Sequence, residues 1–358
     1  MIAGAGSGKT RVLVHRVAWL IQIEGVSPNG LMAVTFTNKA AAEMRSRIEE
    51  LLNMSGQTLW VGTFHGLAHR LLRMHWQEAG LPQNFQILDA DDQLRLVKRI
   101  MRDQGIDEQK WPARQAVWFI NSQKDEGKRS KEIPVSDDLF QITHKKIYEN
   151  YERLCNQGGL VDFAELLLRS HELWLENPSL LRHYQERFQS ILVDEFQDTN
   201  GLQMDLLMQL VGPPHNVCVV GDDDQSIYGW RGAQVSNILQ FGHFFPNPKV
   251  VRLENNYRST EAILRVANAL IHHSPARHEK SLRATIRGGE KVALMALPGD
   301  EEEALWMAKE IRRSRTKENR RWEDFAVLFR TNTHIRKVEQ VFRQEAVSYT
   351  HLTLPTKA

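Results

Sequence analysis

Cysteine is scarce in this chain, and long apolar runs are missing. Only Cys155 and Cys218 occur in 358 residues, too far apart in sequence for a disulfide framework or a zinc-site spacing. This usage fits a reducing compartment. No apolar run approaches the ~18 residues that cross a bilayer, and no signal peptide precedes the glycine-rich loop near the N-terminus. We therefore expect a cytoplasmic protein that does not contact a membrane.

A strong excess of one charge is also absent. The 46 basic and 44 acidic side chains give a net charge of +2, which excludes a global basic field, so any surface that binds nucleic acid has to be local. The hydrophobic content of 42% and charged content of 25% are ordinary for a soluble globular enzyme. The length predicts two or three domains.

Short apolar runs alternate with amphipathic stretches along the chain. In the stretch after the run 31–36, apolar side chains recur at helical spacing at Met44, Ile48, Leu51 and Leu52. This alternation predicts an α/β fold with a parallel sheet covered on both faces. The predicted strands are 31–36, 59–64, 191–196, 217–221, 250–254 and 325–329.

Residues 66–188 have a different character. They are rich in Arg, Lys, Gln and Trp and show few strand patterns, while 114–121 and 163–175 are typical of helices. We interpret this stretch as a helical insertion between two strands of one sheet.

A glycine-rich loop near the N-terminus has the composition of a phosphate-binding loop. Its residues are Gly4, Ala5, Gly6, Ser7, Gly8, Lys9 and Thr10. Backbone N–H groups in such a loop surround phosphate oxygens, Lys9 supplies charge for the β- and γ-phosphates, and the Thr10 hydroxyl can ligate Mg²⁺. The strict pattern has glycine at position 3, where this chain has Ala3. Taken alone, the motif leaves open a simple glycine-rich turn.

Two acidic residues follow a second apolar run. The run 191–193 predicts a buried strand, and Asp194 and Glu195 stand at its carboxyl end. There Asp194 can hold the Mg²⁺ shell and Glu195 can accept a proton from the attacking water. The alternative is a surface acidic pair that caps the next helix. The two motifs together predict an ATPase that uses ATP and Mg²⁺, without saying what it drives.

Longer motifs supply that context. Segments 194–199 and 221–232 read DEFQDT and GDDDQSIYGWRG, and further segments occur at 35–41, 62–65, 159–163 and 256–260. In sequence and order they resemble the motifs of superfamily 1 DNA helicases of the UvrD/Rep group, and the resemblance covers about residues 3–346. It implies a RecA-like parallel sheet of the P-loop NTPase type.

The resemblance also implies roles around the nucleotide. Gln225 would sense the γ-phosphate, Arg258 would act as an arginine finger, and Tyr257 would stack on the adenine. Arg11, directly after the phosphate loop, would belong to the same nucleotide site. An Asn-Tyr-Arg triplet outside such a pattern is an ordinary strand end.

A second set of residues would bind single-stranded DNA, which needs aromatic faces and polar groups. By resemblance, the stacking residues are Phe36, Tyr228 and Trp230, although a Phe or Trp is usually a core residue. The polar contacts would come from Thr37, Asn38, Thr63, His65 and Arg231.

Two basic groups leave alternatives open. His69, Arg70 and Arg73 share a helix face by spacing, and Lys124, Lys128, Arg129 and Lys131 form a cluster in sequence. Each group is either a solvated surface or a contact with duplex ahead of the motor.

The resemblance gives the following organisation. Residues 1–65 and 189–254 form the first RecA-like domain, 66–188 the helical insertion, and 255–346 the start of a second RecA-like domain. The implied function is a 3′→5′ DNA helicase that acts at single-strand/duplex junctions, with repair proteins in excision and mismatch repair. Alternatives are an ATP-switched DNA-binding module and the helicase part of a recombination helicase–nuclease.

Both ends of the chain are unusual. Only Met1 and Ile2 precede the phosphate loop, where a core strand is expected, so we expect a piece of a longer protein that does not unwind DNA by itself. Residues 347–356 back-translate to a string that resembles a transposon-end sequencing adapter. We therefore interpret 347–358 as a non-native tail; the alternative is an ordinary terminal strand.

Overall fold

The computed structural model describes residues 1–358 except 135, 213–215, 275–276, 332 and 351–358. The chain divides into two compact units, Met1–Glu290 and Lys291–Ala358. The boundaries expected from the sequence for the helical insertion and the second RecA-like domain stay predictions.

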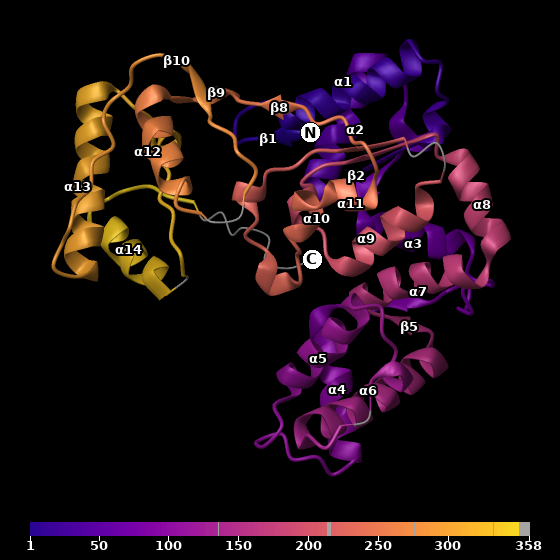
Figure 1. The fold of residues 1–358 in the computed structure, drawn as a ribbon. Helices are drawn as coiled ribbons and strands as arrows, with labels where there is room; N and C mark the ends of the chain where they lie inside the picture. Colours follow the sequence, from indigo (N-terminus) through magenta and orange to yellow (C-terminus); the bar gives the residue numbers. More distant parts are fainter. Residues whose placement is uncertain (135, 213–215, 275–276, 332, 351–358) are drawn as a thin grey trace. The chain divides into compact units, whose positions relative to one another are not determined.

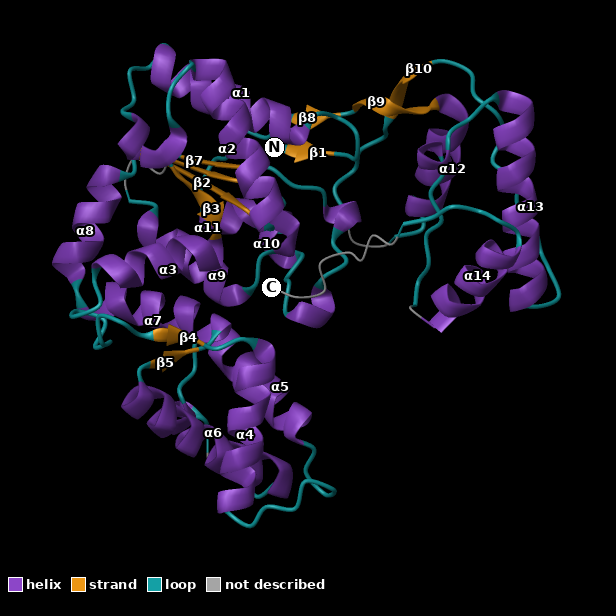
Figure 2. Cartoon of the chain, turned by 180° about the vertical axis from the view of Figure 1, so that it is seen from behind, coloured by secondary structure: helices purple, strands orange, loops and turns teal. Residues whose placement is uncertain are grey.

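The first unit is built on a parallel sheet. Its four central strands follow the order β3-β2-β6-β7. They are β2 (Leu31–Thr35), β3 (Trp60–Thr63), β6 (Ser190–Val193) and β7 (Val217–Val219). Figure 2 shows β2, β3 and β7 side by side among the surrounding helices. A parallel α/β fold is thereby confirmed.

A short strand beside β7 leads into the phosphate loop. Strand β1 (Ile2–Ala3) pairs in parallel with β8 (Arg252–Leu253). On its other side, the Ala3 N–H donates to the Gly221 carbonyl at 3.0 Å. The loop after β1 therefore opens beside the segment that follows β7.

Apolar side chains cover both faces of the sheet because alternate residues point to opposite sides. Leu31 and Ala33 of β2 join one core with α1 (Lys9–Gln22) and α2 (Asn38–Leu52). Met32 and Val34 join the other core. That core is covered by α3 (Phe64–Met74), α7 (Phe163–Glu176), α8 (Pro178–Arg187) and α9 (Gly201–Leu210).

Three helices between β3 and β6 pack around a core of their own, and Figure 1 shows them gathered together. They are α4 (Ala90–Asp103), α5 (Ala113–Asp125) and α6 (Leu139–Gly158). The short ladder of β4 (Gln86–Ile87) with β5 (Leu160–Val161) stands where the chain enters and leaves this cluster. The helices expected at 114–121 and 163–175 are present as α5 and α7.

The first unit ends with a strand pair around a helix. Strand β9 (Asn255–Thr260) runs parallel to β10 (Arg283–Ile286), and α12 (Glu261–Ile271) lies between them in sequence. Shorter elements of this unit are α10 (Ser236–Leu239), α11 (Phe241–Phe244), η1 (Pro28–Gly30), η2 (Gly56–Thr58), η3 (Ser130–Glu132), η4 (Phe196–Asp198), η5 (Asp223–Gln225) and η6 (Gly229–Arg231).

The second unit packs α13 (Asp300–Glu318) against α14 (Thr333–Gln344), with η7 (Trp322–Asp324) between them. The strand expected at 325–329 is wrong. These described residues form no ladder, although Phe325, Val327 and Phe329 pack on the core of the two helices. The alternation of apolar residues therefore predicted which side chains pack on the core, although no described strand pairs with this segment.

The start of the expected tail makes contacts within the second unit. Val347 is buried, and its N–H donates to the Phe342 carbonyl at 2.8 Å. The Tyr349 ring lies 6.1 Å from the Phe342 ring. Residues 351–358 lie outside the described part, and the non-native origin of 347–358 stays a prediction.

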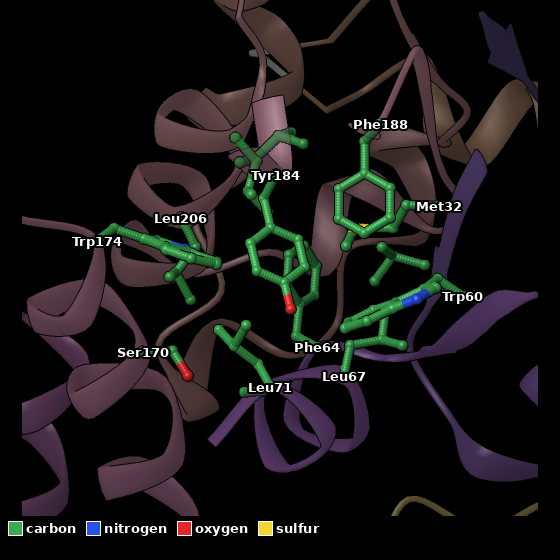
Figure 3. Close-up of a pocket in the computed structure, with 14 residues that line it drawn as sticks. Met32, Trp60, Phe64, Leu67, Leu71, Ser170, Trp174, Tyr184, Phe188 and Leu206 are labelled. Carbon is green, nitrogen blue, oxygen red and sulfur yellow. The ribbon is translucent and has the colours of Figure 1, made fainter. Parts of the chain in front are cut away.

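Aromatic side chains surround a cavity of about 50 Å³ between the sheet and α3, α7 and α8. In Figure 3, Tyr184 stands between Trp60 and Trp174, and Leu67 and Leu71 lie below these three rings. The rings of Trp60 and Phe188 meet edge to face at 5.3 Å. Trp60 is therefore a central packing residue.

We expect Trp60→Ala to lower the free energy of unfolding by about 3–5 kcal/mol, because a fully buried ring leaves a cavity that the sheet cannot close. Trp60 is 1% exposed, whereas Trp118 is 61% exposed. Trp118→Ala is the matched control and should stay within about 0.5 kcal/mol of the wild type. Urea unfolding followed by circular dichroism measures both; equal effects would contradict the burial.

Candidate ATPase centre and single-strand track

The glycine-rich loop has the backbone geometry that phosphate binding needs. Gly6 and Gly8 adopt left-handed φ values of 67° and 87°, which glycine reaches at no steric cost. Gly8 is the N-cap of α1, so the loop ends at the positive end of a 14-residue helix. The Ser7 hydroxyl fixes the turn by donating to the Gly4 carbonyl at 2.7 Å. Arg11 is exposed in the first turn of α1.

The two motifs predicted to form an ATPase meet at the carboxyl end of β6. The Lys9 ammonium donates to Glu195 Oε2 at 3.0 Å, and the Thr10 hydroxyl donates to Asp194 Oδ2 at 3.1 Å. Burial, followed by the Glu195 charge, raises the pKa of Asp194. A hydroxyl and a buried carboxylate side by side fit Mg²⁺, which prefers one or two protein oxygens beside phosphate oxygens.

Gln197, which sequence reasoning missed, connects Glu195 to the loop after β7. Its Nε2 donates to Glu195 Oε2 at 2.9 Å, and its Oε1 accepts the Asp222 N–H at 2.9 Å. Asp222 in turn accepts a hydrogen bond from the Gln225 amide. The predicted γ-phosphate sensor Gln225 therefore reaches Glu195 through two intermediates. Within the described residues, no direct bond between Gln225 and the phosphate loop is present.

Another buried carboxyl lies beside this site. Burial, together with the Glu195 charge, raises the pKa of Asp198 to about 7. Asp198 Oδ2 accepts from the Gln197 amide at 3.4 Å. Negative charge is therefore costly around Glu195, which favours a position for Lys9 beside it.

Strand β9 brings the Asn-Tyr-Arg triplet to the phosphate loop. The Asn256 amide donates to the Ala5 carbonyl at 2.6 Å, and the Tyr257 N–H donates to the Gly6 carbonyl at 2.9 Å. A Cβ on Gly6 would lie 2.7 Å from Arg258 Cβ, so only glycine fits this approach. Tyr257 and Arg258 are exposed. Asn256 is buried, and sequence reasoning had not counted it as a site residue.

The predicted stacking residues gather into one aromatic cluster. The rings of Phe36 and Tyr228 lie 4.8 Å apart, and those of Tyr228 and Trp230 lie 6.4 Å apart. The Arg231 guanidinium stands 5.6–5.8 Å from all three rings. Because Phe36 and Tyr228 already touch, a base has no room between them. The 68% exposed Trp230 offers the open face.

Two helix N-termini stand next to the predicted polar DNA contacts. The Thr37 hydroxyl caps α2 by accepting the Ala40 N–H at 3.1 Å, and Thr63 caps α3 by accepting the Gly66 N–H at 3.1 Å. The Thr63 hydroxyl is 3.5 Å from Asn38 Oδ1. These caps orient backbone N–H groups, which favour anions such as DNA phosphates.

His65 lies in the first turn of α3, where its ring meets the Phe163 ring edge to face at 6.3 Å. Burial and the nearby Arg231 charge lower its pKa to about 4. His65 is therefore neutral at neutral pH and can contact a DNA phosphate only as a hydrogen-bond donor.

Lys124 and Arg129 fit neither alternative for the basic cluster, a solvated surface or a contact with duplex DNA. Lys124 is 1% exposed and pairs with Asp162 at 2.7 Å and Glu165 at 2.9 Å. Arg129 contacts the carboxylates of Glu152, Glu165 and Glu172. Both cations are structural, because buried charges need partners.

The basic group on α3 also contacts other parts of the protein. Arg70 donates to the Leu59 carbonyl at 3.2 Å, and Arg73 donates to the Phe85 carbonyl at 2.8 Å. These guanidiniums tie α3 to the neighbouring backbone, which gives both of them a structural role.

Comparisons with known protein families also indicate a helicase. Residues 1–246 match the UvrD/REP helicase N-terminal domain, and residues 251–354 match the UvrD-like helicase C-terminal domain. The chain belongs to the UvrD/Rep helicase family, which confirms the resemblance drawn from its motifs.

Individual relatives are similar along nearly the whole chain. It is 52% identical to DNA helicase II of Escherichia coli over 98% of its length, covering 48% of that protein. It is 51% identical to DNA helicase II of Salmonella typhimurium and 38% identical to ATP-dependent DNA helicase PcrA of Staphylococcus aureus, each over 98% of its length and 48% of theirs. The chain thus spans about half the length of these curated relatives. No helix among the described residues is long and apolar enough to cross a membrane.

Proposed function

We propose that this chain carries the ATP-hydrolysing centre and part of the single-strand track of a 3′→5′ DNA helicase that acts in DNA repair. The observation that carries the proposal is the pairing of Lys9 with Glu195 and Thr10 with Asp194 in one loop-and-strand site. The aromatic cluster of Phe36, Tyr228 and Trp230, with Arg231, supports the proposed single-strand track.

In this proposal each group near the phosphates has one task. Thr10 and Asp194 would hold Mg²⁺, which would supply positive charge against the phosphates. Lys9 moves from Glu195 to the phosphates when ATP binds, which leaves Glu195 free to accept the proton of the attacking water. Arg258 then stabilises the charge on the transferring phosphoryl group.

The proposed DNA side uses stacking without base specificity. Single-stranded bases stack on Trp230 and its neighbours, because every base presents an aromatic face. Backbone phosphates lie near the N-termini of α2 and α3 and near Arg231. The partners are single-stranded DNA and its junctions with duplex, together with repair proteins in the cytoplasm.

A chimaera tests the proposal. In it, residues 3–346 replace the matching part of E. coli DNA helicase II. We expect single-stranded DNA to stimulate its ATP hydrolysis and expect it to unwind a duplex with a 3′ tail. ATP-dependent DNA binding without stimulated hydrolysis would instead favour an ATP switch. Unwinding that proceeds only from a 5′ tail would contradict the polarity.

We expect Trp230→Ala to weaken single-strand binding by about 1–3 kcal/mol, the worth of one base–aromatic stack. The loss should be similar for oligo-dT and for mixed sequence, and fluorescence anisotropy of a labelled oligonucleotide measures it. Trp306→Ala, in α13 of the other unit, is the matched control. An unchanged affinity of the folded Trp230 variant would remove this ring from the track.

A further inference from the structure

Lys280 is a buried cation that neither the motifs nor the proposed chemistry uses. Its side chain is 3% exposed, and Nζ lies 2.8 Å from Asp222 Oδ1, 2.8 Å from Asp223 Oδ1 and 2.9 Å from Asp224 Oδ2. One ammonium thus offers its three N–H groups to three consecutive carboxylates. The side chains of Asp222 and Asp223 are 4% and 0% exposed, so water does not screen their charges.

The remaining oxygens of this acidic triplet are also satisfied. Arg277 binds both oxygens of Asp224 at 3.0 and 2.9 Å. Asp223 Oδ2 accepts the His278 N–H at 2.8 Å. Asp222 Oδ2 accepts the Gln225 amide, so Lys280 and Gln225 hold the same carboxylate. The position of the Gln225 side chain therefore depends on a carboxylate that Lys280 fixes.

The segment that carries Lys280 also contacts the phosphate loop. The Leu282 side chain covers Gly4, so a Cβ added at Gly4 would require Leu282 to shift. Asn268 of α12 holds the Leu282 backbone through two hydrogen bonds, of 2.9 and 3.2 Å. A short strap thus touches the phosphate loop with Leu282 and the loop of Gln225 with Lys280.

We propose that Lys280 is a positioning residue, which holds the loop 222–225 so that Gln225 can respond to nucleotide and pass that response toward Tyr228 and Trp230. This inference deepens the proposed ATPase function and rests on it. Without the ammonium, two buried carboxylates would repel each other with no cation between them, and the loop would have to move toward water. An exposed ion pair would have little effect, but this one is buried on both sides.

Hydrogen–deuterium exchange of the 358-residue chain tests the positioning step. The variants are Lys280→Met, Lys280→Arg and the double variant Lys280→Met/Asp223→Asn, which restores the charge balance of the cluster. Lys98→Met is the matched control, because Lys98 pairs with Glu108 on the surface at 2.7 Å. We expect Lys280→Met to speed exchange of amides 222–226 by about tenfold or more, with α1 and β6 unchanged. In the double variant and in Lys280→Arg, exchange of amides 222–226 should stay close to that of the wild type.

The chimaera adds a functional readout. There we expect Lys280→Met to lower DNA-stimulated ATP turnover about tenfold, with the KM for ATP within about twofold of the parent. Combined with Gln225→Ala, it should cause little further loss, because both changes act through one amide. A parent chimaera without DNA-stimulated turnover contradicts the proposed function and leaves the exchange result standing.

Three outcomes overturn the inference itself. One is wild-type exchange at 222–226 in Lys280→Met. Another is faster exchange spread equally over α1 and β6, since that marks general destabilisation. The third is a loss of turnover that multiplies with that of Gln225→Ala. If Lys280→Met does not fold, the double variant decides: exchange at 222–226 close to that of the wild type supports the positioning role, and exchange as fast as in unfolded chain excludes it.

Discussion

Glu195→Gln is expected to retain ATP binding and to lose hydrolysis by about 10²–10⁴-fold, the usual contribution of a general base. Glutamine has nearly the same shape as glutamate but cannot accept the proton of the attacking water. In the proposed site, Lys9 and the loop N–H groups hold the phosphates, and this substitution removes none of these groups. ATP turnover of the chimaera with saturating single-stranded DNA measures the loss, and a fluorescent ATP analogue measures binding.

The structure adds an expectation about affinity. Lys9 donates to Glu195 at 3.0 Å, so Lys9 has to leave this carboxylate in order to bind phosphate. Glu195→Gln removes the opposing charge, and nucleotide should therefore bind at least as tightly as to the parent. Glu186→Gln, at an exposed position of α8, is the control. Turnover within tenfold of the parent would remove Glu195 from the role of base.

Regular elements were predictable where a residue pattern coincides with tertiary packing. The apolar run at 31–36 became β2, and Met44 and Ile48 are buried at the predicted helix face, whereas Leu51 of the same face is 42% exposed. The run at 325–329 shows the limit. Its residues alternate and pack correctly, yet a strand also requires a neighbour to receive its hydrogen bonds, and the described residues supply none.

The site was predictable where motifs are long and contiguous. Lys9, Thr10, Asp194 and Glu195 meet as expected. Lys280 was missed because a single side chain that bridges distant segments leaves no local pattern. Gln197 stands inside the motif 194–199, but its bond to the Asp222 N–H, 25 residues away, could not be read from the sequence. Partners remote in sequence also explain the error at Lys124. Its carboxylate Asp162 lies 38 residues away, so the basic stretch looked exposed.

Arg258→Ala is expected to lower ATP turnover by about 10³–10⁵-fold, the range for the loss of an arginine finger. The β9 backbone fixes Arg258 beside Gly6 through the bonds of Asn256 and Tyr257 to the phosphate loop. This attachment places Arg258 beside the phosphate loop, as the proposed arginine finger requires. Since its stabilisation acts in the transition state, kcat should fall far more than the KM for ATP rises.

Two further variants separate charge from geometry. Arg258→Lys keeps a positive charge but loses the planar fork that binds two phosphate oxygens, so it should recover only a small part of the turnover. Arg265→Ala, on the exposed surface of α12, should hydrolyse ATP like the parent, since among the described residues Arg265 forms an ion pair with Glu261 alone, across one helical turn at 3.4 Å. Single-turnover hydrolysis in the chimaera distinguishes a slower chemical step from slower product release. Arg258→Ala turnover within tenfold of the parent would mean that another cation stabilises the transferring phosphoryl group, and that β9 only positions the loop.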